Sequence, residues 1–353
     1  MRVLHILYSG MGGVFSVVDS LIKNNDLNTS GVLYIGPNLS KDTLKHQNIL
    51  KKNFFFVKTK KFFTSLFFFN TIFRIYTFNP QIIVLHNYQI FPCVLVKFFL
   101  RKKLIYVDHK PLKLKNFKYF LIINFFQFFI DHFVVLNNEN YFYVKKKLFN
   151  KNKISKIYNG IDLKYFKSKT KKKYQTFSVG MAARLNDTKS QDILINAIQS
   201  LIKKKIKILC YLAGDGENIN NLKKILKKNN KKKIIFSGAL DQSELKRWYN
   251  KINLYIQASK GEGMSISIFQ AMAMGIPVMG SDVTGINNLK YPSKSSNMVF
   301  KNNPKDLENK ILNFFKSKNS IKNRIIKEQT KYLNNNFSND LMNKKYEKLY
   351  KSI

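Results

Sequence analysis

Short apolar runs alternate with longer helix-like segments along almost the whole chain. In the first half, strand-like runs at residues 3–8, 31–35, 82–86, 103–108 and 132–136 are separated by segments of helical character. Each run is continuously apolar, which is typical of strands that are covered by helices on both faces. The alternation therefore predicts an α/β fold built on parallel sheets.

The alternation restarts after a lysine-rich stretch at residues 167–173. A chain of 353 residues exceeds what one hydrophobic core usually organises, so we expect two doubly wound, Rossmann-like domains. The predicted domains are 1–166 and 167–337, with a last helix at about 338–353 that packs back onto the first domain. Ligands of such sheets bind at the carboxyl ends of the strands, so two facing units predict a cleft lined by strand-to-helix loops.

The net charge of +42 is the most unusual feature of the composition. By itself, this charge suggests an anionic partner, either nucleic acid or a membrane surface. The alternative is compositional drift, since Lys, Asn, Ile, Phe and Tyr are all abundant and the lysines are spread over both halves. No nucleic-acid-binding module is recognisable, so we expect no nucleic acid partner.

The sequence shows no sign of export, membrane insertion or metal binding. Cys93 and Cys210 are far apart and lie in no CxxC pattern, so neither a disulfide nor a metal site is expected. The N-terminus lacks the apolar core of a signal peptide. The longest apolar run, 119–130, is shorter than the roughly 18 residues that cross a bilayer. We therefore expect a cytoplasmic protein.

Two loops are candidate anion sites, one of them rich in glycine and the other basic. Gly12 and Gly13 follow the first strand and open a helix, where backbone N–H groups can approach an anion. The alternative is a tight turn without a ligand, and the pattern is not the GxGxxG of an NAD site. Arg184 and Lys189 lie five residues apart in a later strand-to-helix loop, where both can converge on one diphosphate.

The most informative segment is the loop at residues 258–265. Its glycines and the following helix offer N–H groups to a phosphate, and Glu262 places a carboxylate beside them. A carboxylate there would repel a phosphate unless it also accepted hydrogen bonds from another group, such as sugar hydroxyls. Gln270 is a polar residue in the otherwise apolar helix that follows, and is either a satisfied core amide or a ligand contact.

Two histidines, His86 and His109, come just after strands of the first half. A lone histidine is usually structural. His109 lies in a proline-bounded loop at a strand end, which favours presentation of its side chain to a ligand.

Taken together, these segments resemble family 4 of the retaining glycosyltransferases, which have the GT-B fold. The matching motifs run in order over residues 1–312: Gly10 to Gly13, Asn159-Gly160-Ile161-Asp162, Arg184-Leu185 with Lys189, Ala213-Gly214-Asp215-Gly216, Gly261-Glu262-Gly263, and Ala271 to Val278. The resemblance implies transfer of a sugar from a nucleoside diphosphate sugar to an acceptor hydroxyl, with retention of configuration. The first domain would then be the acceptor side and the second the donor-binding side.

The resemblance also implies roles for single residues. The catalytic set would be Glu262, Arg184, Lys189 and His109. Residues that line the donor would be Gly12, Gly13, Gly238, Ala239, Leu240, Gly263, Met264, Ser265 and Gln270. No DxD motif is present, so we expect neither a metal nor a cofactor, with the nucleotide sugar as donor substrate.

One position departs from the family pattern: the second of two glutamates eight positions apart is here Gln270. The change predicts weaker donor binding, since a charged acceptor is replaced by a neutral one. One alternative function is therefore that of a non-catalytic relative that binds a sugar nucleotide. A second alternative is a sugar-nucleotide epimerase of the same architecture.

The expected acceptor is a glycan or a lipid-linked molecule in the biosynthesis of a surface polysaccharide or lipopolysaccharide. Lysines interleave with phenylalanines at residues 54–78 and 97–130, which predicts either helices that lie on an anionic membrane surface or ordinary core helices. Peripheral attachment to the inner face of the cytoplasmic membrane would follow from the first alternative.

Overall fold

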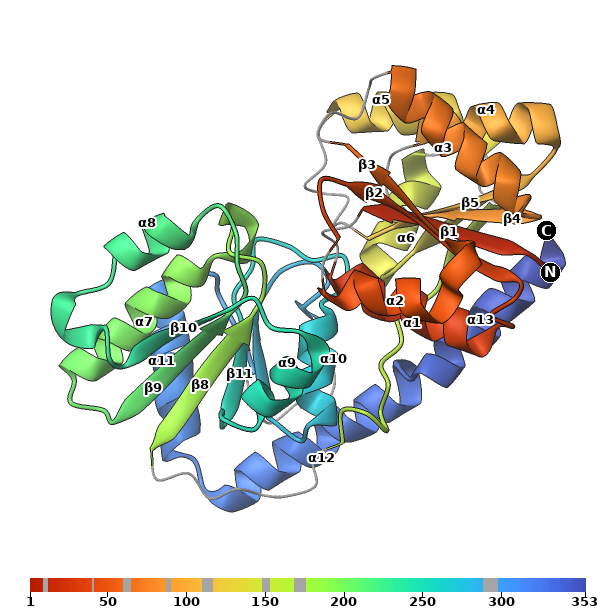
Figure 1. Ribbon diagram of the computed structural model, residues 1–353. Coiled ribbons are helices and arrows are strands. Elements are labelled where there is room, and N and C mark those ends of the chain that lie inside the picture. Colours follow the sequence, from red (N-terminus) through yellow and green to blue (C-terminus); the bar gives the residue numbers. More distant parts are fainter. Residues whose placement is uncertain are drawn as a thin grey trace. The chain divides into compact units, whose positions relative to one another are not determined.

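The computed structural model describes residues 1–8, 12–39, 41–59, 65–86, 90–109, 117–147, 153–167, 176–287 and 298–353. The chain divides into two compact units. Unit 1 comprises Met1–Ile161 together with Asn339–Ile353, and unit 2 comprises Asp162–Ser338. Each unit holds one parallel sheet with helices on both faces (Figure 1), so the predicted fold class is confirmed. The division lies at residues 161 and 162, where the sequence had predicted a boundary at 166 and 167.

Unit 1 is built on a seven-stranded sheet with the order β3-β2-β1-β4-β5-β6-β7. Its strands are β1 (Val3–Tyr8), β2 (Ser30–Gly36), β3 (Phe54–Lys58), β4 (Ile82–Leu85), β5 (Lys103–Asp108), β6 (His132–Val135) and β7 (Ile154–Lys156). All neighbouring strands are parallel. The direction of winding reverses between β1 and β4, which defines the topological switch point of this sheet.

Helices cover both faces of the unit 1 sheet. They are α1 (Gly12–Asn24), α2 (Lys41–Leu50), α3 (Ser65–Phe78), α4 (Ile90–Leu100), α5 (Phe117–Phe126), α6 (Asn138–Lys147) and α13 (Asn339–Ser352). Side chains of α1 and α2 pack with one face of β1 and β2, whereas those of α3 to α6 pack on the opposite face. The C-terminal helix α13 lies against α1 (Figure 1), where the Ser20 hydroxyl donates to Oδ1 of Asn343 at 3.3 Å.

Unit 2 is a six-stranded parallel sheet with the order β10-β9-β8-β11-β12-β13. Its strands are β8 (Phe177–Ala182), β9 (Ile208–Ala213), β10 (Ile234–Gly238), β11 (Leu254–Gln257), β12 (Val278–Ser281) and β13 (Val299–Phe300). Its helices are α7 (Gln191–Lys203), α8 (Ile219–Lys224), α9 (Gln242–Tyr249), α10 (Ile266–Ala273), α11 (Pro304–Lys316) and α12 (Asn319–Asn336). Here the switch point lies between β8 and β11.

The Phe-rich segment at residues 54–78 is only partly helical. Phe54–Lys58 forms the edge strand β3, paired with β2, and the helix α3 begins at Ser65. The expectation that residues 54–78 are helical was therefore wrong for the first part of the segment, because consecutive aromatic and β-branched residues favour a strand. No helix among the described residues combines the length and apolar character that crossing a bilayer requires.

Candidate functional site

The strand order of unit 2 brings two polar loops together at the carboxyl ends of β8 and β11. Lys189 lies in a short 3-10 helix after β8, and Glu262 lies between β11 and α10. The Lys189 ammonium lies 2.5 Å from Oε1 and 2.6 Å from Oε2 of Glu262. Their side chains are 23% and 8% exposed. The result is a largely buried ion pair at the switch point, where doubly wound sheets bind ligands.

Hydrogen bonds hold the two loops against each other. The Thr188 carbonyl oxygen accepts from the backbone N–H of Lys260 at 2.8 Å and from the Ser259 hydroxyl at 2.9 Å. A third segment supports Glu262 from behind, since a Cβ at Gly285 would lie 2.2 Å from the Glu262 carbonyl oxygen. With a φ of +80°, position 285 requires glycine both for its conformation and for this close approach. Hydrogen bonds and close backbone contacts thus hold the loops that carry the ion pair.

Glu262 has a second donor on the sheet. Nε2 of Gln257 donates to Oε1 of Glu262 at 3.1 Å, and Oε1 of Gln257 accepts from the Tyr255 hydroxyl at 2.7 Å. Burial, with the negative charge of Glu262 adding to it, raises the pKa of Tyr255, so the phenol stays protonated and remains a donor. A carboxylate has about four lone-pair sites, so Glu262 can still accept from a ligand hydroxyl.

Arg184 is in the same loop as Lys189, but its guanidinium points to a different carboxylate. Its Nη2 lies 3.5 Å from Oε2 of Glu217, and the two side chains are 60% and 59% exposed. An ion pair as exposed as this contributes little to stability, so Arg184 can leave Glu217 at small cost. The structure does not bring Arg184 onto the pair formed by Lys189 and Glu262.

Gly263, Met264 and Ser265 lead from Glu262 into α10. The Ser265 hydroxyl lies 3.2 Å from that of Ser267 and does not cap the helix. The first-turn N–H groups of α10 therefore receive no hydrogen bond from the residue that usually supplies it. Such groups at a helix N-terminus are suited to bind an anion.

Gln270 lies in the buried face of α10. It is 4% exposed, and its Oε1 accepts from the hydroxyl of the buried Tyr249 at 3.1 Å. Of the two interpretations that the sequence left open, these contacts support a satisfied core amide.

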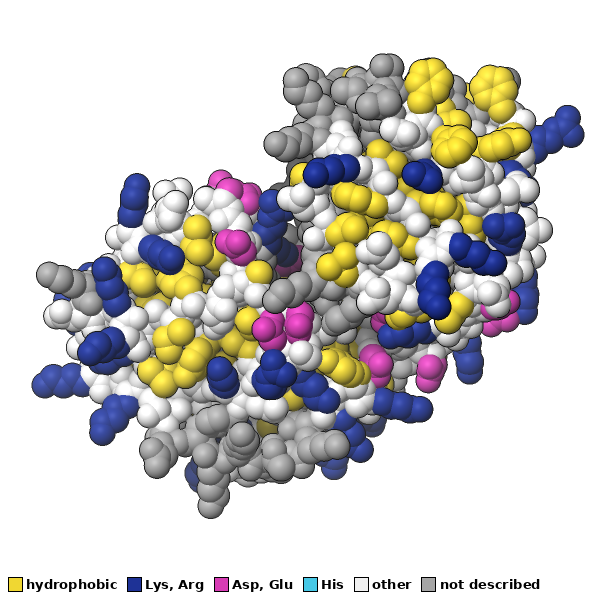
Figure 2. Space-filling model, viewed as in Figure 1, with side chains coloured by type: hydrophobic (Ala, Val, Ile, Leu, Met, Phe, Trp, Pro, Cys, Tyr) yellow, Lys and Arg dark blue, Asp and Glu magenta, His cyan; other side chains and the backbone are white. Residues whose placement is uncertain are grey.

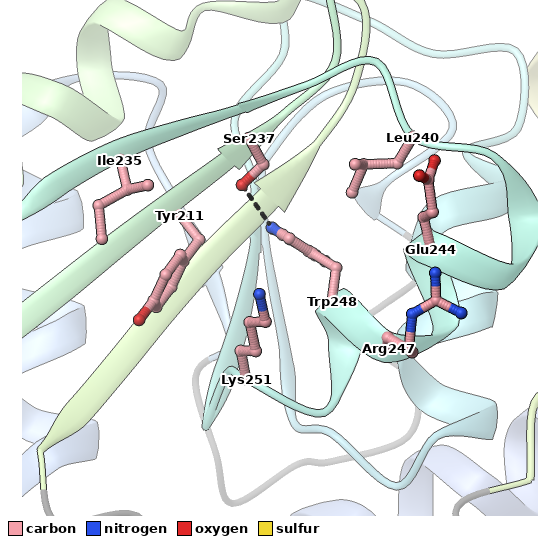
Figure 3. Close-up of a pocket in the computed structure, with 8 residues that line it drawn as sticks. All are labelled: Tyr211, Ile235, Ser237, Leu240, Glu244, Arg247, Trp248 and Lys251. Atoms are coloured by element: carbon pink, nitrogen blue, oxygen red, sulfur yellow. Dashed lines mark hydrogen bonds between the residues drawn. The ribbon is translucent and has the colours of Figure 1, made fainter.

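Gly238 is the last residue of β10, and Ala239 and Leu240 follow it. The Gly238 carbonyl oxygen accepts from the backbone N–H of Gly214 at 2.7 Å, which ties this end to the loop after β9. Leu240 also lines a cavity of about 370 Å³ over β9, β10 and α9 (Figure 3). Within it, Nε1 of Trp248 donates to the Ser237 hydroxyl at 3.2 Å. Neither Lys189 nor Glu262 lines this cavity.

In unit 1, the predicted glycine loop is described only in part. Gly12 and Gly13 are the first residues of α1, while Gly10 and Met11 lie outside the described residues.

A line of three imidazoles crosses the switch point of unit 1. Nε2 of His109, after β5, lies 2.9 Å from Nδ1 of His86, after β4. Nε2 of His86 in turn lies 3.0 Å from Nδ1 of His5, within β1. His5 and His86 are buried and His109 is partly buried. Burial lowers the pKa of His5 to about 3 and that of His109 to about 4, and it lowers the pKa of His86 well below the usual range.

His5 was not among the candidates drawn from the sequence, although a signal was present. Side chains alternate along a strand, and β1, β4 and β5 are adjacent and parallel. Leu4 and Ile6 belong to the core cluster that faces α3 and α4, so His5 points to the other face. The same alternation places His86 and His109 on that other face. Once the strand order is known, the alternation therefore places His5, His86 and His109 on the same face of neighbouring strands, where they can be in contact.

Among the described residues, no cluster of three or more His, Cys, Asp or Glu side chains is arranged to hold a metal ion. Cys93 and Cys210 are both buried and form no disulfide.

Comparison with known proteins gives the family of unit 2. Residues 163–332 match the family model described as glycosyl transferases group 1. The uncharacterized glycosyltransferase MJ1069 of Methanocaldococcus jannaschii is 25% identical over 232 residues, which cover 63% of this chain and 59% of that protein. The O-antigen biosynthesis glycosyltransferase WclY of Escherichia coli is 27% identical over 170 residues, covering 44% of each chain. The chain therefore spans less than two thirds of the length of these relatives.

A solved structure gives the fold of the whole chain. The Anabaena protein HepE in complex with UDP-glucose superposes with a TM-score of 0.85 at 16% identity, covering 100% of both chains. Residues 163–332 of unit 2 thus match the group 1 glycosyltransferases, and the chain has the GT-B fold. The resemblance inferred from the motifs is confirmed at this level.

Proposed function

We propose that the protein transfers a sugar from a nucleoside diphosphate sugar to an acceptor hydroxyl, with retention of anomeric configuration. The observation that carries this proposal is the pair of Lys189 and Glu262 at the switch point of unit 2. The ammonium supplies positive charge for a diphosphate, and the carboxylate accepts hydrogen bonds from sugar hydroxyls. A nucleotide sugar presents both groups next to each other. Neither the ammonium nor the carboxylate alone would distinguish a nucleotide sugar from other ligands that contain phosphate.

In the proposed reaction, the bond between the anomeric carbon and the diphosphate oxygen breaks, and the acceptor oxygen bonds to that carbon on the same face. The acceptor proton passes to the departing phosphate oxygen. Lys189, joined by Arg184 once it leaves Glu217, stabilises the negative charge that develops on the leaving group. The N–H groups at the start of α10, with Gly263, act on the same charge. We propose that no metal is required.

The remaining residues have proposed roles in donor recognition. Glu262 holds hydroxyls of the donor sugar, and His109 contacts a sugar hydroxyl. Ala239 and Leu240 line the base, and Gln270 takes the place of the ribose-binding glutamate. The hydrogen bond that Gln270 accepts from Tyr249 is compatible with a reduced contribution of Gln270 to donor binding.

A direct test combines donor binding with turnover. UDP-, GDP-, ADP- and CMP-sugars are screened by thermal shift, and the best donor is assayed for sugar transfer to lipid and glycan extracts. Lys189→Ala and Arg184→Ala should each reduce turnover by orders of magnitude; a near-normal rate in either would remove that residue from the mechanism. Interconversion of the donor sugar without acceptor would indicate an epimerase. Binding without turnover on any extract would indicate a non-catalytic relative.

We further propose that unit 1 binds an anionic membrane surface that carries the acceptor. On α3, Phe69, Phe73 and Tyr76 are 73%, 56% and 63% exposed and share one face of the helix, and on α4 Phe99 is 75% exposed. Figure 2 shows hydrophobic side chains gathered over the part of unit 1 where Figure 1 places α3 and α4. Arg74 lies over the Phe73 ring at 5.8 Å, which sets a cation beside the apolar face. Aromatic groups flanked by cations match the interface of anionic lipids.

Flotation with liposomes tests the membrane proposal. The wild type should float with vesicles that contain phosphatidylglycerol and much less with phosphatidylcholine alone, at low salt. Phe69→Ser/Phe73→Ser should lose flotation. The matched control is Leu44→Ser/Ile49→Ser on α2, which removes two exposed apolar side chains from the opposite face of the sheet. Equal flotation of all variants, or no preference for anionic vesicles, would remove this proposal.

A further inference from the structure

The three imidazoles of unit 1 form a hydrogen-bonded line that can run in only one of two directions. All three have a lowered pKa, so each ring is neutral near pH 7 and carries one N–H. In the first direction, His5 donates from Nδ1 to His86, and His86 donates from Nδ1 to Nε2 of His109. In the reverse direction, His109 donates from Nε2 to His86, and His86 donates from Nε2 to Nδ1 of His5.

The surroundings of His5 distinguish the two directions. Nε2 of His5 is buried and has no hydrogen-bond partner among the described residues. The reverse direction would place a proton on this atom and leave an N–H group buried without an acceptor. The first direction leaves only an unused lone pair there. Orphaned buried donors are rarer than under-used acceptors, so the first direction is favoured.

We propose that His5 and His86 are positioning residues that fix His109 in the tautomer with its proton on Nδ1. Because Nε2 of His109 accepts from His86, the N–H on Nδ1 is the group left to face a ligand. Under the proposed function, on which this last step rests, His109 then donates a hydrogen bond to a sugar hydroxyl oxygen. The line lies at the switch point between β1 and β4, where ligands of doubly wound sheets bind.

The same geometry excludes two other roles for His109. A general base would need an unprotonated Nδ1, which this tautomer lacks. A general acid would need a second proton on Nε2, which would reverse both hydrogen bonds and place an N–H on the buried Nε2 of His5. His109 is therefore a neutral donor that neither takes up nor releases a proton during transfer.

The tautomers are measured directly by NMR of the full chain labelled with ¹⁵N-histidine. Long-range ¹H–¹⁵N spectra distinguish a protonated from an unprotonated ring nitrogen, and single substitutions assign the five histidines. His46 is an internal control of the opposite kind. Its Nε2 lies 3.2 Å from a carboxylate oxygen of Asp19 and its Nδ1 lies 2.8 Å from the Tyr34 hydroxyl, so its proton should be on Nε2. A proton on Nε2 of His109 would overturn the proposal.

Two variants of His86 test the positioning role. Phe fills the site without a hydrogen bond, whereas Gln can still donate an amide N–H to Nε2 of His109. Loss of one neutral hydrogen bond predicts a roughly three- to tenfold lower kcat in His86→Phe with a nearly unchanged KM for the donor, and recovery of at least half the rate in His86→Gln. An equal loss in both variants, or a loss in neither, would contradict the role.

The sugar contact has a readout of its own. Saturation with UDP-glucose, or with the donor that the thermal-shift screen selects, should move the ¹⁵N resonance of His109 Nδ1 and leave that of His46 in place. Binding of a donor without that change would refute the contact. Failure of every sugar nucleotide to bind would instead refute the proposed function, while the tautomer of His109 in the free protein still decides the direction of the line.

Discussion

Replacement of Lys189 by Met should weaken both the fold of unit 2 and its binding of the donor. The substitution leaves the Glu262 carboxylate 8% exposed, with Gln257 as a neutral donor. Removal of one partner from a fully buried ion pair costs about 3–5 kcal/mol. Lys189 is 23% exposed and therefore partly solvated, so we expect the lower figure of about 2–3 kcal/mol. For a unit of this size, the melting temperature should fall by about 5–10 °C.

The pair of Lys204 and Glu308 provides a matched control in the same unit. Lys204 Nζ lies 2.5 Å from Oε1 of Glu308, which is only 4% exposed, while Lys204 is 48% exposed. Lys204→Met should therefore also lower the melting temperature, although less, because its ammonium is more solvated. The two variants differ in donor binding: a nucleotide sugar should still raise the melting temperature of Lys204→Met and no longer raise that of Lys189→Met.

A double-mutant cycle completes the test. Lys189→Met/Glu262→Gln removes both charges, so its loss of stability should be smaller than the sum of the two single losses by about 1–2 kcal/mol. Urea unfolding followed by the fluorescence of the one tryptophan, Trp248 in unit 2, measures each value. Additive losses, or a Lys189→Met protein that binds and turns over donor like the wild type, would refute the assignment of this pair to the site.

Three further predictions follow from single contacts. Because the pKa values of His5, His86 and His109 are lowered in the fold, the unfolded chain binds more protons below about pH 6.5; stability should fall by about 4 kcal/mol from pH 7.5 to 5.5, and a flat pH dependence in urea unfolding followed by circular dichroism would contradict this. Gly214→Ala places a Cβ 2.0 Å from a carbonyl oxygen and should cost about 3 kcal/mol or more, whereas Gly238→Ala, with nothing within 4 Å, should cost only about 1–2 kcal/mol; equal melting temperatures would refute the steric reasoning. Gln270→Glu should improve donor affinity by up to about tenfold in calorimetry, and an unchanged Kd would show that the amide is no deficit.

The sheet architecture could be predicted because the central strands of both sheets are largely apolar runs. The strands that were missed are short or lie at the sheet edges. β13 has two residues and β7 has three, so neither leaves a pattern long enough to recognise. β3 was missed because its phenylalanines continue into the Phe-rich sequence of α3, and consecutive aromatic residues carry no period that separates a strand from a helix.

The loops of the site could be predicted, but the contacts between them could not. Lys189 and Glu262 are 73 residues apart, and only the adjacency of β8 and β11 brings them together. The sequence instead suggested that Arg184 would converge with Lys189, since both lie in one loop. Spacing along a loop does not determine side-chain direction, and in the structure Arg184 pairs with the exposed Glu217.

The side chains at the switch point of unit 1 are neutral, whereas those at the switch point of unit 2 are charged. This difference follows from burial and from the net charge of the chain. In unit 1 the polar line is neutral and begins in the interior at His5, where a charged ring would be strongly disfavoured by desolvation and by a net charge of +42. In unit 2 the charged pair sits in loops at the sheet end, where Lys189 keeps contact with solvent. A departing diphosphate requires countercharge, whereas sugar hydroxyls require neutral, directional partners. In the proposed transfer, unit 2 therefore supplies the charged groups, Lys189 for the diphosphate and Glu262 for hydroxyls of the donor sugar, whereas the buried line of unit 1 supplies a neutral donor from His109.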